Sequence, residues 1–200
     1  MQRAALMKTI RCSLLISAAF LLFAGTGAQA HLIHGDVCGF GSGFAHPLLG
    51  LDHLLVMIAV GLWAAQLGGR ARWLVPGSFV GVMIAGATLA MSGLRMPFAE
   101  EGMLLSVLVL GILITATAQL PLTASMVIVG AFALFHGHSH GTEMPLNAVG
   151  FAYGAGFALA TTALHGCGIG LACASQSVKL PVVRWVGATI AVAGICLWVL

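Results

Sequence analysis

Two short segments of the chain gather the residue types that most often bind metal ions. The first, HPLLGLDH, occupies residues 46–53, and the second, FHGHSHGTEMP, occupies residues 135–145. Imidazole ligands suit nickel, cobalt, copper and zinc, whereas sites built from oxygen alone suit magnesium or calcium. Five imidazoles and two carboxylates with no cysteine among them favour a borderline divalent transition metal. The candidate metal ligands are His46, Asp52, His53, His136, His138, His140 and Glu143.

The spacing within each segment indicates how these side chains would meet. His46 and His53 are seven residues apart, so one continuous helix would place them on the same face, about 10 Å apart along its axis. Asp52 either ligates the metal directly or accepts a hydrogen bond from an imidazole and orients it. Gly137 and Gly141 are expected to let the backbone bend where a helix ends, which would turn the imidazoles toward a cavity. Because metal and proton compete for imidazole, binding is expected to weaken in acid.

Four other residues are candidates for metal contact before or after this site. Cleavage after Ala30 would leave His31 with a free α-amine, which chelates a metal together with its own imidazole. His31, His34 and Asp36 are therefore candidate ligands for first capture of the ion, the alternative being a solvated tail. His165, in the segment TTALHGCGIG, is either an exit or relay ligand or a histidine hydrogen-bonded between helices.

The composition indicates which kind of fold positions these residues. The chain has 200 residues, of which 60% are hydrophobic and 6% charged, against about 25% charged in soluble domains. So few charges cannot cover a water-facing surface, which excludes a soluble globular enzyme. The net charge of +3 comes from scattered basic residues, which argues against a nucleic-acid partner. We expect an all-α integral membrane protein whose surroundings are lipid.

Residues 1–30 are typical of a cleaved signal peptide, with basic residues, an apolar run from Ser13 to Phe23 and a small-residue cleavage site at its end. The alternative is an uncleaved first membrane helix. Residues 31–200 form one predicted permease domain, in which the Gly-rich segment 31–45 is expected not to be helical. Close packing of membrane helices is expected at the GxxxG pairs 77–81 and 150–154. The six predicted transmembrane helices cover about 46–66, 73–93, 101–119, 121–137, 146–171 and 182–200.

Charge asymmetry sets the expected orientation of this bundle. Basic residues concentrate in the loops that lie inside when the mature N-terminus lies outside, as the positive-inside rule requires. The inner set is Arg70, Arg72, Lys179 and Arg184, and the outer set is Asp36, Arg95, Glu100, Glu101 and Glu143. The chain is therefore predicted to lie in a bacterial inner membrane, with the mature N-terminus and the C-terminus in the periplasm.

The two histidine segments resemble those of the HupE/UreJ family of nickel/cobalt permeases. Residues 46–53 match that family's HPxxGxDH element, and residues 135–145 resemble FHGxAHGxExP, with Ser139 where the family has alanine. The resemblance implies ATP-independent import of Ni²⁺ or Co²⁺, as transported substrate, from periplasm to cytoplasm for hydrogenase or urease maturation. It also implies that the protein is not an enzyme and has no catalytic cofactor. The residues carried over are His46, Asp52, His53, His136, His140 and Glu143, whereas His138 is added from local chemistry alone.

Two other classes of function remain open at this point. One is a membrane accessory or sensor protein that binds metal without transporting it, although the short loops offer no soluble domain to carry a signal. The other is a membrane metalloenzyme, although the chain contains no HExxH ligand pair. The sequence leaves open nickel against cobalt, proton coupling against facilitated diffusion, and the oligomeric state.

Overall fold

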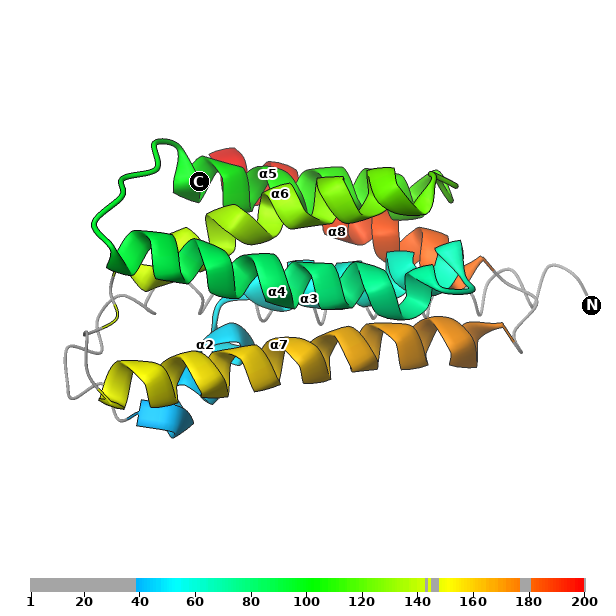
Figure 1. Ribbon diagram of the computed structural model, residues 1–200. Coiled ribbons are helices and arrows are strands. Elements are labelled where there is room, and N and C mark those ends of the chain that lie inside the picture. The colour runs from blue at the N-terminus through cyan, green and yellow to red at the C-terminus, as the bar shows by residue number, and fades with distance from the viewer. Residues whose placement is uncertain (1–38, 143, 145–147, 177–180, 200) are drawn as a thin grey trace, which may run out of the picture. The chain divides into compact units, whose positions relative to one another are not determined.

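The chain folds as an all-helical bundle in the computed structural model, which describes residues 39–142, 144, 148–176 and 181–199. The predicted signal peptide and the capture residues His31, His34 and Asp36 lie outside the described residues. The prediction of an all-α fold is confirmed for the described part of the chain (Figure 1). The helices are α2 (Gly39–Leu49), α3 (Leu51–Leu67), α4 (Ala71–Met91), α5 (Ala99–Thr115), α6 (Leu122–Gly141), α7 (Ala148–Ser175) and α8 (Val182–Val199).

The described helices are long and apolar enough to account for four or five membrane crossings. α4, α6, α7 and α8 each reach that length, and α2 with α3 make a fifth crossing if the bent pair is one span. α5 has 17 residues and is shorter than these four. Large apolar side chains cover the outer surface, including Trp73 and Phe151, each 71% exposed. Such a surface suits hydrocarbon rather than water.

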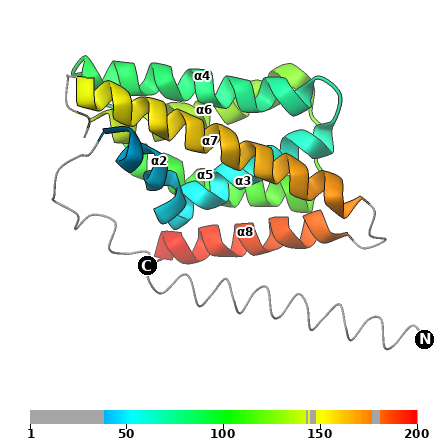
Figure 2. The same ribbon diagram turned by 90° about the horizontal axis from the view of Figure 1, so that it is seen from below.

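Helix α3 lies at the centre of the bundle and contacts α2, α4, α5, α7 and α8. In Figure 2 it runs inside the bundle, whereas α8 lies at the edge beside α5. A helix that is apolar on every side is expected to be buried, and most of α3 is buried, including Trp63. The Trp63 indole N–H donates to the carbonyl of Ala118 at 3.0 Å, so this buried polar group is satisfied.

The predicted continuous helix over residues 46–66 is wrong, because the chain breaks at Gly50. α2 and α3 meet there at an angle of 80°. Gly50 adopts an extended conformation with φ −82° and ψ 118°. A Cβ atom at Gly50 would lie 2.8 Å from Nδ1 of His53 and 3.1 Å from Oδ1 of Asp52. These backbone angles suit any residue, so glycine at position 50 makes room for the side chains of His53 and Asp52 rather than for the bend itself.

The prediction that residues 31–45 are not helical is also wrong for their described part. Helix α2 begins at Gly39 and also contains Gly41 and Gly43. It lies beside the N-terminal half of α7 (Figures 1 and 2), and Gly43 is in close contact with the backbone of Tyr153. Packing against α7 thus supplies the stability that the glycine-rich sequence lacks by itself.

Helix α6 continues through Gly137, so the bend predicted there is wrong, and it ends at Gly141. Gly137 and Gly141 instead face α4, where they contact the backbone of Met83 and Ala87. Glycine at these positions lets two helices approach closely, as in other membrane bundles. These contacts fix the rotation of α6 and thereby the directions of its histidines.

The glycines of α4 also differ from expectation. A Cβ atom at Gly77 or Gly81 would have no neighbouring atom within 4 Å among the described residues, so the packing predicted for that pair is not seen there. Gly86 makes the close contact instead, since a Cβ there would lie 2.6 Å from the carbonyl oxygen of Leu134 on α6. On α7, Gly156 packs closely against the backbone of Phe40 on α2.

These contacts predict opposite effects of two alanine substitutions on the same helix. Gly86→Ala should destabilise the protein by about 1–3 kcal/mol, because α4 and α6 must separate to admit the methyl group. Gly81→Ala should be neutral or stabilising by up to about 1 kcal/mol, because alanine favours the helix and meets open space. Thermal unfolding of the purified protein in detergent measures both. Equal effects of the two substitutions would contradict the packing described here.

Candidate metal centre

Three histidines from three helices converge at the break between α2 and α3. His46, His53 and His140 each offer one ring nitrogen, and these three atoms lie within 4.8 Å of one another. The ring centroid of His140 is 4.5 Å from those of both His46 and His53, and the latter two are 5.4 Å apart. Ligands on opposite sides of a metal with bonds of 2.0–2.1 Å lie about 4.2 Å apart. The three nitrogens therefore lie close enough to hold one metal ion after a small inward movement of the rings.

The bend at Gly50 creates this arrangement. His46 lies in the last turn of α2 and His53 in the first turn of α3. The prediction that they share one helix face, about 10 Å apart along its axis, is wrong. The bend brings one ring against the other instead. His140, 87 residues beyond His53, arrives at the C-terminal end of α6.

Asp52 orients the imidazole of His53. The carboxylate Oδ1 accepts a hydrogen bond from Nδ1–H of His53 at 2.7 Å. With the proton held on Nδ1, the neutral ring presents a lone pair at Nε2. A carboxylate that fixes a ligating histidine in this way is a recurrent feature of metal sites. Of the two roles considered for Asp52, this geometry is the orienting one.

Nε2 of His53 forms a hydrogen bond with Nε2 of His140. Because His53 contributes the lone pair, His140 contributes the proton. A metal ion bound by both nitrogens would replace that proton. The carboxylate of Asp52 lies in the first turn of α3, where the helix dipole favours a negative charge, and it supplies charge that offsets a bound cation.

The remaining predicted ligands, His136, His138 and Glu143, are not part of the triad. His136 is fully buried on α6, with its ring centroid 5.5 Å from that of His53. His138 is also buried, but its Nε2–H donates to the carbonyl of Leu94 at 2.8 Å, beyond the end of α4. The structure does not bring His138 into the triad. Glu143 lies outside the described residues.

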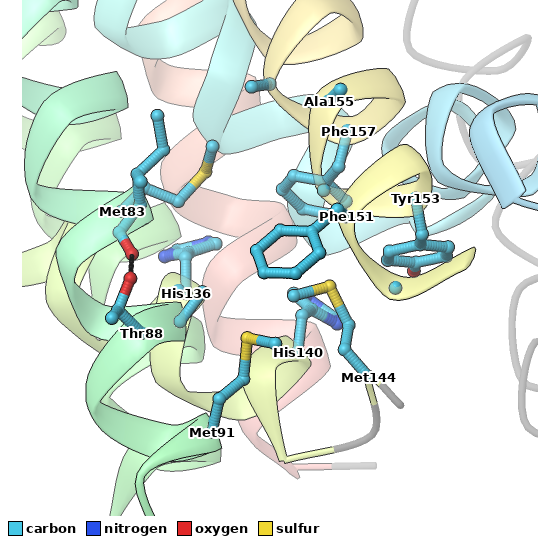
Figure 3. A pocket seen from close by; sticks show the side chains of 16 residues that line it. Met83, Thr88, Met91, His136, His140, Met144, Phe151, Tyr153, Ala155 and Phe157 are labelled. Carbon is cyan, nitrogen blue, oxygen red and sulfur yellow. Dashed lines mark hydrogen bonds between the residues drawn. The ribbon is translucent and has the colours of Figure 1, made fainter. Parts of the chain in front are cut away.

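A cavity of about 220 Å³ adjoins the triad between α4, α6 and α7. A cavity of this size is large enough for an ion with several of its waters. Figure 3 shows His136 and His140 at its wall, together with methionines 83, 91 and 144. Phe157 of α7 packs against the rings of His46, His53 and His140, at centroid distances of 5.7, 6.2 and 5.0 Å. Sequence reasoning did not single out Phe157, since an aromatic residue in a membrane helix carries no distinctive signal.

The apolar bundle, the broken helix and the histidine triad together define a membrane protein with a candidate metal centre. The family model described as HupE / UreJ protein matches residues 18–197, and the chain belongs to this family. It is therefore a multi-pass membrane protein, and the resemblance inferred from the two histidine segments is confirmed.

A curated relative extends the comparison over most of the chain. "Protein HupE" from Rhizobium leguminosarum bv. viciae is 44% identical over 174 residues, which cover 86% of this chain and 90% of that protein. No solved structure matches the chain.

The geometry predicts different effects of two substitutions on binding of Ni²⁺ to the purified protein. Asp52→Ala should weaken binding by about 10–100-fold, because His53 loses the acceptor that orients its lone pair. His138→Gln should leave binding nearly unchanged, because glutamine retains a donor for the Leu94 carbonyl. Isothermal titration calorimetry in detergent measures both affinities. Weakened binding in His138→Gln alone would contradict the assignment of the triad.

Proposed function

We propose that this protein is a secondary transporter that carries Ni²⁺, or Co²⁺, from the periplasm to the cytoplasm. The observation that carries the proposal is the convergence of His46, His53 and His140 at a break in a membrane helix. Ion sites of secondary transporters are commonly built at discontinuous helices. Family membership supports a transport function and a nickel or cobalt substrate, and three imidazoles suit either ion. The imported ion supplies hydrogenase or urease maturation.

His136 and Glu143 complete the proposed set of ligands around the triad and Asp52. His136 is the nearest further imidazole to His53, and Glu143 follows α6 directly in the sequence. Residues His31, His34 and Asp36 are the proposed capture site on the mature N-terminus, after removal of residues 1–30. His138, which is bonded to Leu94, is proposed to hold the end of α4 rather than the ion.

The distribution of charge supports an orientation with the triad toward the periplasm. Arg70 and Arg72 lie where α3 ends and α4 begins, at the opposite end of α3 from His53. Arg184, at the start of α8, donates to a carbonyl at the C-terminal end of α5. The first turn of α5, at the triad's end of the bundle, carries Glu100 and Glu101. Basic residues thus gather at the end that the positive-inside rule assigns to the cytoplasm.

Labelling of single cysteines tests this orientation, in a version of the chain whose five native cysteines are replaced by alanine. A membrane-impermeant maleimide should label Ser92→Cys, at the end of α4, in intact spheroplasts. It should label Arg70→Cys only after the membrane is permeabilised. Both parent residues are exposed, so burial does not limit the reaction. The reverse pattern would place the triad toward the cytoplasm and exclude import from the periplasm by this route.

Uptake of ⁶³Ni²⁺ by cells that express the chain tests the function itself. His53→Ala and His140→Ala should each lower uptake by more than about tenfold, because each removes one of three ligands. His138→Gln should transport at nearly the wild-type rate, at equal membrane levels of all variants. Competition by excess Co²⁺, Zn²⁺ or Mg²⁺ should rank Co²⁺ first and Mg²⁺ last, since Mg²⁺ prefers oxygen ligands. Absence of uptake above the empty vector, with folded protein present, would favour a metal-binding accessory protein.

A further inference from the structure

Two buried histidines, His136 and His165, lie further inward than the triad. They lie toward the end of the bundle that carries Arg70, Arg72 and Arg184, which is called the arginine-bearing end. His136 precedes His140 by four residues on α6, which places it about 6 Å further along the helix axis. His165 follows Phe157 by eight residues on α7, about 12 Å along that axis. Because Phe157 packs against the triad, His165 lies well inward of the triad, toward the arginine-bearing end. The exposed fractions of His136 and His165 are 0% and 1%.

Both of these imidazoles are held in the tautomer that binds metal. Nδ1–H of His136 donates to the carbonyl of Phe132 at 2.9 Å, and Nδ1–H of His165 donates to the carbonyl of Met57 at 2.7 Å. A carbonyl can only accept, so the neutral rings present lone pairs at Nε2. Neither Nε2 atom has a hydrogen-bond partner within the described part of the chain. A buried acceptor without a partner is costly, so a purely structural role leaves half of each ring unexplained.

The two rings are joined by one continuous set of contacts. The ring of Phe79 on α4 lies 5.6 Å from the ring of His136 and 5.1 Å from that of His165. Met83, one turn from Phe79, places its sulfur 3.9 Å from Oγ1 of the buried Thr161, one turn from His165. A thioether on the same face of α4 as Phe79 and a hydroxyl on the same face of α7 as His165 therefore lie close together, and both can contact a cation.

Helix packing by itself does not require the imidazole of His165. The α3 and α7 backbones already meet at Gly61 and Gly168, where a Cβ atom at either position would overlap the other helix. A hydrogen bond to Met57 needs only one side-chain N–H. An asparagine supplies a donor at the position of Nδ1, so the Nε2 atom is the part of His165 that packing leaves unused.

We propose that His165 is an inner relay ligand, which receives the cation from the triad by way of His136 and binds it through Nε2 before release at the arginine-bearing end. This proposal rests on the transport function proposed above. A single imidazole binds an ion more weakly than three do, and conduction requires inner sites that an ion can leave.

The test compares binding and transport in the same purified protein, with ⁶³Ni²⁺ as the probe. Equilibrium binding is measured in detergent, and influx is measured in proteoliposomes with a negative interior potential. His165→Asn keeps the donor for Met57 but lacks Nε2, whereas His165→Ala lacks both. Thr162→Ala is the matched control, one turn from Ala158 on the exposed side of α7. Molecules whose triad faces the outside of the vesicle are counted by labelling Ser92→Cys with the membrane-impermeant maleimide, in the version of the chain without native cysteines.

His165→Asn and His165→Ala should both lower influx by about tenfold or more. Binding to the triad should stay within about twofold of the wild-type affinity, because distant sites act independently, and Thr162→Ala should match the wild type. Near-normal influx in His165→Asn would overturn the proposal and assign His165 a hydrogen-bonding role. Weakened binding in His165→Asn would also overturn it, because the substitution would then act on the triad. Absence of influx in the wild-type protein would remove the transport function, and the relay with it, and is distinguishable from failure of the relay alone.

Discussion

The contact between Asp52 and His53 at the break after α2 is the constraint on which the candidate metal centre depends. A residue with a side chain at position 50 would collide with both partners of this hydrogen bond. In an unbroken helix, His46 and His53 would lie about 10 Å apart along the axis, too far for one ion to bind both. The glycine therefore leaves room for this hydrogen bond, and the carboxylate fixes which nitrogen of His53 faces the other rings.

Close backbone contacts hold the surrounding helices in place. Lipid offers little hydrophobic gain for helix association, so small residues that permit dense packing take over that role. Gly43 lets α2 reach α7, Gly61 lets α3 reach α7, and Gly137 lets α6 reach α4. The same three contacts position His46, His53 and His140, because each histidine lies within eight residues of one of these glycines. The glycine content therefore serves the geometry of the rings as much as the stability of the bundle.

The sequence predicted the helical class, the membrane setting, the family and the two segments that meet, because composition and residue type carry that information. It did not predict the break at Gly50. Glycine is frequent in membrane helices because it permits close packing, and the residue type alone does not distinguish a packing glycine from one at a break. The expected bend at Gly137 also hid the helical periodicity of the three histidines on α6. On a continuous helix, His136 and His140 share a face and His138 points away from it, and the structure follows this periodicity. His138 joined the candidate ligands from local chemistry alone, which does not use this periodicity.

The triad, His136 and His165 together offer ligands that suit a divalent cation in a medium of low polarity. A bare ion at membrane depth is costly, and neutral imidazoles offset only part of that cost. The carboxylate of Asp52 adds a negative charge where three rings can bind the ion most tightly, so the deepest energy well lies at the triad. The more tightly the triad binds the ion relative to a single inner imidazole, the more slowly the ion leaves the triad, by about tenfold for each 1.4 kcal/mol. A potential of about −100 mV supplies about 4.6 kcal/mol to a divalent ion that crosses completely, equivalent to about a 2,000-fold concentration ratio. For the proposed transport, the triad must therefore bind the ion weakly enough that the ion can leave it.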